Sequence, residues 1–376
     1  MIEITDKHQC CGCSACSQRC PVQCIQMKED AEGFLYPDVN KEQCIDCGLC
    51  EKVCPILSKV PERETLQVYA AKNPNTTIRV RSSSGGIFTL LAEQVLNQRG
   101  VVFGVRFNSK WEVIHDYTET IEGLDVFRGS KYVQSFIGDT YKQAENFLKN
   151  GRLVLFTGTP CQIKGLKFFL RKEYTNLLTV DFVCHGVPSP KVWNLYLKQI
   201  SSGMKLDNIN FRDKSTGWKK YSFLYDCQGQ KVKENFESNL FMKAFLSNLC
   251  LRPSCYACNV KKGKSLSDMT MGDFWGIQHI QSDLDDDLGT SLLMIYSPSV
   301  KHMLLGNCTL SSQELEKAVK YNMCITRSVA EPINRAYFFY NLNRTKNLQQ
   351  TFSKNVDPSL LARIQRYLFR KLNKCE

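Results

Sequence analysis

Two copies of one cysteine pattern near the N-terminus constrain this chain more than any other feature of its sequence. The copies are Cys10, Cys13, Cys16 and Cys20 followed by Pro21, and Cys44, Cys47, Cys50 and Cys54 followed by Pro55. Each has the spacing C-x2-C-x2-C-x3-C-P, and 34 positions separate Cys10 from Cys44. This repetition indicates an internal duplication rather than a chance scatter of cysteines.

The spacing suits an iron–sulfur cluster better than a zinc site. Three thiolates two residues apart on one tight loop can bind three irons of a [4Fe–4S] cluster, and the fourth iron then takes a ligand from elsewhere. A zinc ion needs four ligands, commonly from two C-x2-C pairs, so a third cysteine and the C-P end would be surplus. We therefore predict two [4Fe–4S] clusters, with a pair of zinc sites as the alternative.

The region 1–57 resembles a bacterial two-cluster ferredoxin. Cys24–Lys28 and Phe34–Tyr36 flank a turn rich in Asp, Glu and Gly, which predicts a β-hairpin between the two cluster loops. In two-cluster ferredoxins the fourth cysteine of each copy ligates the other cluster. The resemblance implies one cluster on Cys10, Cys13, Cys16 and Cys54, and a second on Cys44, Cys47, Cys50 and Cys20. We interpret Cys11 and Cys24, which lie outside the pattern, as small apolar side chains.

Composition indicates a globular protein of two or three domains, because 43% of its 376 residues are apolar and 23% are charged. No apolar run approaches the roughly 18–20 residues that span a bilayer. The first residues, MIEITDKHQC, lack the basic and apolar regions of a signal peptide. We therefore expect a cytoplasmic protein whose 19 cysteines serve metal ligation or redox chemistry rather than disulfides.

The net charge of +12 favours acidic partners. No basic run is interleaved with aromatic residues and no zinc-finger spacing occurs, so we do not predict nucleic-acid binding. An acidic electron-carrier protein fits the charge, and a solvated basic surface is the alternative.

Beyond the polar stretch 58–66, which we interpret as a linker, the chain alternates between short strands and helices. We expect strands at Gln67–Ala71, Val101–Phe107, Leu153–Thr157 and Leu177–Val183, and helices at Gly86–Gln98, Asp139–Lys149, Gln162–Arg171 and Pro190–Ile200. The predicted fold class is therefore α+β and α/β. A small ferredoxin-like domain precedes a mixed-sheet α/β domain at 67–345, with a break near 150, and a basic tail at 346–376.

Three segments carry small and polar residues next to predicted strands or helices. Ser82–Gly86 precedes a helix and offers hydroxyl and N–H groups to an anion, although an ordinary helix cap is the alternative. Arg128–Ser135 could hold a planar ring with polar edges. Phe156–Gln162 follows an apolar strand, at the end where α/β sheets bind ligands, but matches neither a Walker loop nor G-x-G-x-x-G.

In order, SSSGGIF, RGSKYVQS, FTGTPCQIKGL, VCHGVPSP, FRDKSTGW, CLRPSCYAC and GDFWG resemble the β-subunit family of coenzyme F420 hydrogenases and dehydrogenases. Coenzyme F420 is a 5-deazaflavin, and the resemblance extends to about residue 340. It implies an FAD-binding, iron–sulfur oxidoreductase that moves electrons between clusters and a two-electron partner. A flavin suits this role because it can hold one or two electrons.

The resemblance also implies site residues. The FAD phosphates and ribityl chain would lie near Ser83, Ser84, Gly85, Gly86, Thr157, Gly158 and Thr159, and the ring near Lys131, Tyr132, Gln134 and Ser135. A third [4Fe–4S] cluster would use Cys161, Cys250, Cys255 and Cys258, with a zinc site or buried thiols as alternatives. His185 and Asp273 are candidates for proton transfer, and a structural role is the alternative for each.

Two classes of function follow. The first is an enzyme that exchanges electrons with an acidic ferredoxin or flavodoxin and acts on a small organic substrate or coenzyme F420. The second is a non-catalytic electron-transfer subunit of a larger redox complex, linked in bacterial members to polysaccharide biosynthesis. A binding protein with purely structural clusters is disfavoured, since one cluster would suffice to hold a small domain. The size of the second domain favours the enzyme.

The C-terminal sequence from Pro358 predicts a basic amphipathic helix. Apolar residues recur at helical spacing at Leu361, Ile364, Leu368 and Leu372, and basic residues lie elsewhere at Arg363, Arg366, Arg370, Lys371 and Lys374. Such a helix can lie on a membrane surface or pack on the domain.

Overall fold

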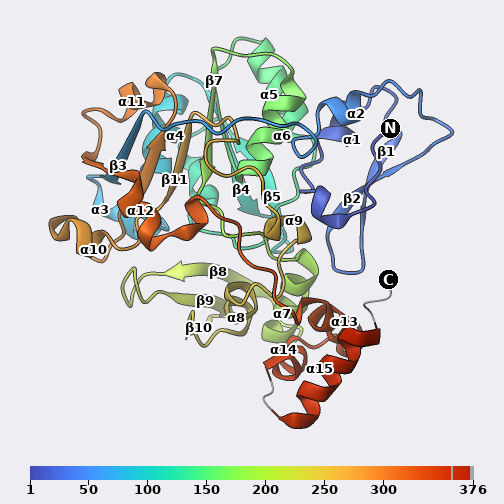
Figure 1. The fold of residues 1–376 in the computed structure, drawn as a ribbon. Helices are drawn as coiled ribbons and strands as arrows, with labels where there is room; N and C mark the ends of the chain where they lie inside the picture. Colours follow the sequence, from blue (N-terminus) through green and yellow to red (C-terminus); the bar gives the residue numbers. More distant parts are fainter. Residues whose placement is uncertain (357–358, 373–376) are drawn as a thin grey trace.

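A computed structural model describes residues 1–356 and 359–372, and Figure 1 shows its arrangement. The two cysteine patterns fold around the predicted hairpin. Strands β1 (Ile25–Glu29) and β2 (Leu35–Val39) pair antiparallel, with Ile25 opposite Val39. Short helices follow the cysteine loops, and these are η1 (Lys7–Gln9), α1 (Ala15–Arg19) and α2 (Leu49–Lys52). The small ferredoxin-like region is therefore confirmed.

A mixed sheet of eight strands, in the order β13-β3-β12-β11-β7-β6-β4-β5, forms the centre of the large domain. Its strands are β3 (Gln67–Lys72), β4 (Val101–Phe107), β5 (Val113–Thr118), β6 (Val154–Gly158), β7 (Leu177–Phe182), β11 (Met269–Asp273), β12 (Ser291–Ile295) and β13 (Thr309–Gln313). Strands β4, β6, β7 and β11 run parallel, while β5 and β12 are antiparallel to their neighbours. The predicted mixed α/β sheet is confirmed.

Helices cover both faces of this sheet (Figure 1). Strand β6 is buried along its whole length, which explains its unbroken apolar run. Helix α4 (Ile87–Asn97) packs on one face, against Leu155 and Val180. Helices α5 (Thr140–Lys149) and α6 (Pro160–Leu170) pack on the other, against Val154 and Phe156.

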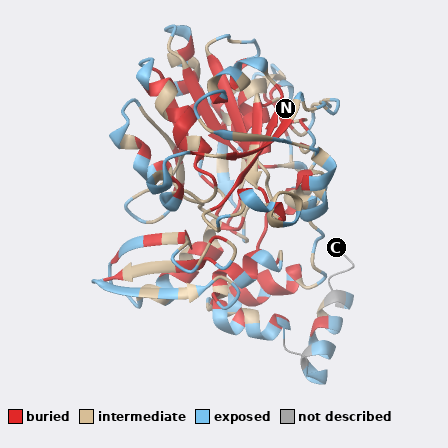
Figure 2. Cartoon of the chain, turned by 90° about the vertical axis from the view of Figure 1, so that its left-hand side faces the viewer, coloured by how far each residue is buried: buried red, intermediate tan, exposed pale blue. Residues whose placement is uncertain are grey.

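A second layer lies beside the sheet (Figures 1 and 2), and its core is aromatic. It contains the antiparallel strands β8 (Leu206–Asp213), β9 (Ser222–Cys227) and β10 (Gln230–Asn235), with helices α7 (Pro190–Ser201), α8 (Leu240–Leu246), α13 (Arg335–Thr345) and α14 (Leu348–Val356). Its buried rings include Trp193, Phe211, Phe223 and Phe241. Only α7 among these elements was predicted.

Shorter elements complete the described chain. They are α3 (Thr76–Arg81), η2 (Glu122–Phe127), α9 (Pro253–Tyr256), α10 (Ile277–Ile280), η3 (Ser282–Leu284), α11 (Pro298–Leu304), α12 (Leu315–Tyr321) and η4 (Met323–Ile325). No helix among the described residues is long and apolar enough to cross a membrane.

The stretch 58–66 contains no helix or strand, but it is bound along its length to the large domain. The Leu66 N–H donates to the Ile295 carbonyl at 2.8 Å. The Arg63 guanidinium donates to the carbonyls of Ser267 at 3.0 Å and Tyr296 at 3.4 Å. This segment therefore packs against the large domain and is not a free connection between two domains.

The predicted C-terminal helix is α15 (Leu360–Leu372), whereas Lys374 lies outside the described residues. The apolar stripe of α15 does not pack against the rest of the protein. Leu361, Ile364 and Leu368 are 73%, 45% and 49% exposed. Instead, the Phe369 ring contacts the Tyr337 and Tyr340 rings, with centroids 5.3 and 4.9 Å away. Figure 2 shows how much of α15 faces solvent.

Candidate metal centres and the adjoining cavity

The structure divides the eight N-terminal cysteines between two small cavities. Cys10, Cys13, Cys16 and Cys54 line a cavity with about 320 Å³ of empty volume. Cys20, Cys44, Cys47 and Cys50 line another of about 330 Å³. Each cavity thus takes its fourth thiol from the other copy of the pattern. We name these groups the inner and the outer cysteine group, respectively.

The thiols of these two groups are ligands that suit iron–sulfur clusters. The Ile2 N–H donates to the Cys50 Sγ at 3.3 Å, and Arg252 Nη2 donates to the Cys10 Sγ at 3.5 Å. Burial raises the pKa of Cys16 to about 12, so binding iron would release protons from the thiols. Within the described residues, no three His, Cys, Asp or Glu side chains are arranged to hold a metal ion. A [4Fe–4S] cluster does not need several ligands on one ion, because each thiolate binds a different iron.

The two groups differ in their surroundings. Cys47 in the outer group is exposed, whereas Cys13, Cys16 and Cys54 in the inner group are buried. The inner loop rests on helix α6, where a Cβ atom at Gly165 would lie 3.0 Å from the Cys13 Sγ. The inner group therefore adjoins the large domain and the outer group faces solvent.

A third cysteine group lies in the large domain, but it differs from the predicted set. Burial raises the pKa of Cys184 well above its ordinary value, and the nearby thiols of Cys255, Cys161 and Cys258 raise it further. Cys11 lies between the inner group and the third group, where its neighbour Cys13 raises the pKa of the Cys11 thiol and Cys161 lowers it. Cys11 is thus more than an apolar filler.

Cys250 is not brought to this group. It is completely buried in the aromatic core of the second layer. Burial raises its pKa to about 12, and its nearest charged neighbour is the Arg335 guanidinium. The structure therefore places Cys184, rather than Cys250, with Cys161, Cys255 and Cys258.

The polar groups of the predicted phosphate-binding segment Ser83–Gly86 form hydrogen bonds with other parts of the protein. Ser84 Oγ donates to the Thr290 carbonyl at 2.9 Å, and the Gly85 N–H donates to Ser291 Oγ at 3.0 Å. Ser83 Oγ lies 2.7 Å from Ser130 Oγ. A Cβ atom at Gly85 would lie 2.4 Å from the Ala71 carbonyl, which explains the glycine by packing on β3. Gly86, with φ +79°, begins helix α4.

The predicted ring-binding side chains also have protein partners. Lys131 Nζ donates to the carbonyls of Val126 and Arg128 at 2.9 Å, and burial lowers its pKa to about 7. The Tyr132 ring stacks on Phe245, with centroids 5.0 Å apart. The remaining contacts are Gln134 Nε2 to the Cys11 carbonyl at 3.0 Å and Ser135 Oγ to His115 Nδ1 at 2.9 Å.

The segment after β6 is similarly engaged. Thr157 Oγ1 donates to the Phe103 carbonyl at 2.9 Å, and Thr159 caps helix α6 together with Gln162. Gly158 ends β6, next to the Gln162 side chain. This segment and Ser83–Gly86 follow strands four positions apart in the sheet, about 19 Å at about 4.8 Å per strand. A single ligand would have to be long to reach both.

The two proton-transfer candidates are bound in structural contacts. His185 Nε2 lies 2.6 Å from Asn248 Oδ1, and burial lowers the His185 pKa. Asp273 forms an ion pair with buried Arg212 and accepts a hydrogen bond from Trp218 Nε1 at 3.3 Å. These contacts match the structural alternative for both residues.

A larger cavity, of about 800 Å³, lies beside the end of strand β7 and the first residues of helices α6 and α12. Its walls include Pro160, Asp181, Cys184 and the 62–66 segment, but none of the eleven residues predicted to bind FAD. We name it the linker cavity. Cys184 places the third cysteine group at its edge. The sequence signal for Asp181 was an acid at the end of an otherwise apolar strand.

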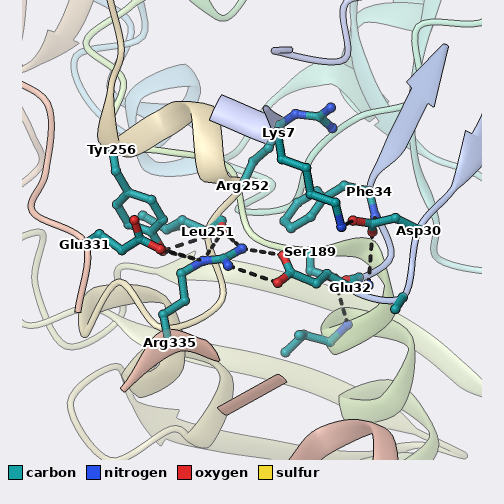
Figure 3. A network of polar contacts seen from close by, with 12 residues as sticks. Lys7, Asp30, Glu32, Phe34, Ser189, Leu251, Arg252, Tyr256, Glu331 and Arg335 are labelled. Carbon is teal, nitrogen blue, oxygen red and sulfur yellow. Dashed lines mark hydrogen bonds and ion pairs between the residues drawn. The ribbon is translucent and has the colours of Figure 1, made fainter. Parts of the chain in front are cut away.

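Two buried arginines join the hairpin to the large domain (Figure 3). Arg252 donates to the Cys10 carbonyl at 2.7 Å, the Leu35 carbonyl at 2.8 Å and Gln134 Oε1 at 3.0 Å. Arg335 Nη1 donates to Glu32 Oε1 at 3.0 Å, at the tip of the hairpin. Sequence analysis missed both, because their partners on the hairpin lie more than 200 residues away in the chain.

Comparisons with known proteins agree with this arrangement. Residues 151–317 match the family that represents the C terminus of the coenzyme F420 hydrogenase/dehydrogenase beta subunit. Residues 9–57 match a 4Fe-4S dicluster domain. The two matched ranges follow one another along the chain, with the dicluster match first.

A chain of the F420-reducing [NiFe] hydrogenase complex from Methanosarcina barkeri is among the similar solved structures. It is 16% identical, with a TM-score of 0.47, over 78% of this chain and 94% of that chain. The comparison with curated proteins found no match.

The range that matches the beta-subunit family contains the third cysteine group and Asp181, whereas residues 83–135 precede this range. The family match therefore covers the edge of the linker cavity formed by Pro160, Asp181 and Cys184. The dicluster match covers all eight cysteines of the inner and outer groups. An iron–sulfur electron-transfer role follows from the two matches together.

Proposed function

We propose that this protein is an oxidoreductase that passes electrons between two [4Fe–4S] clusters and a bound FAD, which exchanges two electrons with an organic substrate or coenzyme F420. The observation that carries the proposal is the division of the eight pattern cysteines between two cavities, four in each, where Cys11 and Cys24 add a fifth thiol to one cavity each. The clusters would supply one-electron transfer, and the flavin would couple it to two-electron chemistry.

The cysteine groups follow one another from solvent toward the linker cavity. The outer group has an exposed thiol, the inner group rests on α6, and Cys11 connects it to Cys161 of the third group. An acidic ferredoxin or flavodoxin would dock near the outer group. An arrangement that ends at a cavity favours an enzyme over a non-catalytic electron-transfer subunit, including one that serves polysaccharide biosynthesis.

The flavin positions predicted from the resemblance remain part of this proposal. Variants of Gly85 and of Lys131 test these positions, since replacing either residue should lower the flavin content if these segments hold the FAD.

For proton transfer, unchanged turnover of His185→Asn would remove His185 as a candidate, and Asp273→Asn tests Asp273 in the same way.

The first experiment is anaerobic purification with flavin and iron quantitation, and a visible spectrum before and after dithionite. We expect one flavin and about eight to twelve irons per chain, at four per cluster. Iron without flavin would reduce the proposal to an electron carrier.

The third cysteine group can be tested in the same way. If it holds a cluster, Cys184→Ser should lower iron by about four per chain. Cys250→Ser is the matched control, because its thiol lies in the aromatic core. Equal iron in wild type and Cys184→Ser would remove the third cluster.

We also propose peripheral membrane contact through α15, because its apolar stripe is exposed beside basic residues. Arg363 on this helix is also exposed, and a cationic helix of this kind binds anionic lipid surfaces. Sedimentation with anionic vesicles should carry the protein down, whereas the triple variant Leu361→Ser, Ile364→Ser, Leu368→Ser should stay in solution. If the protein instead self-associates and the triple variant does not, the apolar stripe binds a second copy of the chain.

A further inference from the structure

We propose that Cys324, in the wall of the linker cavity, is a nucleophile that adds to the carbonyl carbon of a small aldehyde. His185 takes the thiol proton, and Asn248 holds the His185 ring in place. The nucleophile stands independently of the clusters and the flavin, whereas the substrate class rests on the proposed function, in which an organic substrate exchanges two electrons.

A histidine and a cysteine from distant segments meet beside the cavity. His185, which follows strand β7, has its Nδ1 3.6 Å from the Sγ of Cys324 in helix η4. Cys324 is partly exposed and lines the linker cavity, so a small molecule there can reach it. A thiol that faces an imidazole nitrogen is the arrangement that activates cysteine nucleophiles.

The other imidazole nitrogen fixes the orientation of the ring. His185 Nε2 lies 2.6 Å from Asn248 Oδ1, while Asn248 Nδ2 donates to the Ala330 carbonyl at 3.5 Å. Because an amide oxygen can only accept, Nε2 carries the hydrogen and Nδ1 is left to accept from the Cys324 thiol. The Phe245 ring packs edge-on against the imidazole, with centroids 5.1 Å apart.

A cation lies beside the nucleophile. Lys261 lines the same cavity, and its Nζ donates to the carbonyls of Cys184 and Cys324 at 2.7 Å each. An ammonium group has three N–H donors, so one can still donate to an oxygen that becomes negative during attack. Nucleophile, base and cation at one cavity wall are the groups that addition to a carbonyl needs.

The addition balances without a further reactant. The sulfur–carbon bond forms as the carbonyl π bond breaks, and the π electron pair moves to oxygen. The thiol proton passes to His185 Nδ1 and then to this oxygen, which gives a hemithioacetal. Among carbonyl compounds an aldehyde is favoured, because its adduct keeps a C–H bond, which two-electron oxidation requires.

Iodoacetamide tests the nucleophile, because sulfur displaces iodide and the same thiol proton is released. Peptide mass spectrometry gives the alkylation rate of each cysteine in the full chain, purified anaerobically. Cys308 is the internal control, since it is also partly exposed but its Sγ donates to the Leu304 carbonyl at 3.5 Å. We expect Cys324 to react about ten-fold faster or more than Cys308. Equal rates in the wild type would overturn the proposal.

Two variants assign the faster reaction to its cause. His185→Phe keeps a ring beside Phe245 but removes the base. Asn248→Gly suits the left-handed backbone at this position, with φ +62°, but releases the imidazole. Each should bring the Cys324 rate close to that of Cys308, and iron content equal to wild type would show that the variant is folded. An undiminished rate in His185→Phe would remove the base from the site.

Propanal tests the substrate class, with propan-1-ol as the matched control that lacks a carbonyl. Propanal should slow the alkylation of Cys324 but not of Cys308, because the adduct occupies the Cys324 sulfur, and propan-1-ol should slow neither. If propanal leaves the Cys324 rate unchanged, the aldehyde is overturned. The proposed function is judged separately by the flavin and iron content of the wild type.

Discussion

Arg252 is one of the residues through which the large domain contacts the inner cysteine group. Its guanidinium is almost completely buried and lies 4.3 Å from the centre of the Tyr36 ring. Because it donates to both the carbonyl and the Sγ of Cys10, its positive charge should favour the reduced, more negative state of a cluster bound there.

We therefore expect Arg252→Gln to lower the reduction potential of the inner cluster by about 60 mV or more. This follows from a hydrogen bond to a charged group worth about 1.5–3 kcal/mol and about 59 mV per tenfold change for one electron. Potentiometry followed by electron paramagnetic resonance would measure it. Arg335→Gln, at the hairpin tip, is the control, and equal potentials in all three proteins would contradict the electrostatic role.

Asp181 should make stability depend on pH. Burial raises its pKa from 3.8 to about 6, although the hydroxyls of Ser265, Thr270 and Ser267 and the charge of Arg63 lower it. The Tyr296 side chain also faces it. Since the folded state binds this proton more tightly than the unfolded state, Asp181 destabilises the fold progressively as pH rises from about 4 to above 6.

Without added ligand, Asp181→Asn should therefore be more stable than wild type at pH 8, by about 3 kcal/mol. The difference should vanish below about pH 4, where the carboxyl group is protonated in both states. Thermal unfolding of the two proteins across this range is the measurement. A difference that does not change with pH would show that Asp181 is not the source.

At the scale of elements, helix α6 supports the inner cysteine loop through one glycine. A Cβ atom at Gly165 would lie 3.0 Å from the Cys13 Cβ and Sγ and from the Tyr141 hydroxyl. A glycine inside a helix normally costs about 1 kcal/mol relative to alanine, so its presence here indicates a packing requirement.

Gly165→Ala should therefore lower thermal stability and speed the loss of cluster absorbance in air, because the cysteine loop must move away from α6. An ordinary helix position predicts the opposite, a gain of about 1 kcal/mol. Stabilisation with unchanged cluster lifetime would show that α6 does not position the loop.

At the scale of the whole molecule, the net charge of +12 favours long-range attraction of an acidic electron carrier, and this positive charge lies on residues 58–376, since residues 1–57 hold nine acidic and five basic side chains. Electron transfer from an acidic ferredoxin should slow by about ten-fold or more between low salt and roughly 0.5 M salt. Stopped-flow absorbance measures the rate, and an unchanged cluster spectrum is the control. A rate independent of salt would exclude this mode of docking.

The local sequence determined those parts of the fold that depend only on residues close together in the chain. The cysteine spacing predicted the two cluster loops, and the pattern of apolar residues predicted the hairpin and four of the eight strands of the central sheet. These features could be predicted because loop geometry and strand or helix periodicity act over a few residues. The aromatic second layer was largely missed, since its short segments lack a strong period.

Tertiary structure decided what depends on residues far apart in the chain. It brought Cys184 rather than Cys250 to the third group, placed Arg252 on Cys10, and formed the linker cavity around Asp181 from several distant segments. Periodicity predicted the apolar stripe of α15, but only packing decided that another face of the helix is covered. The physical reason is that burial and pairing arise from long-range contacts, which no local pattern specifies.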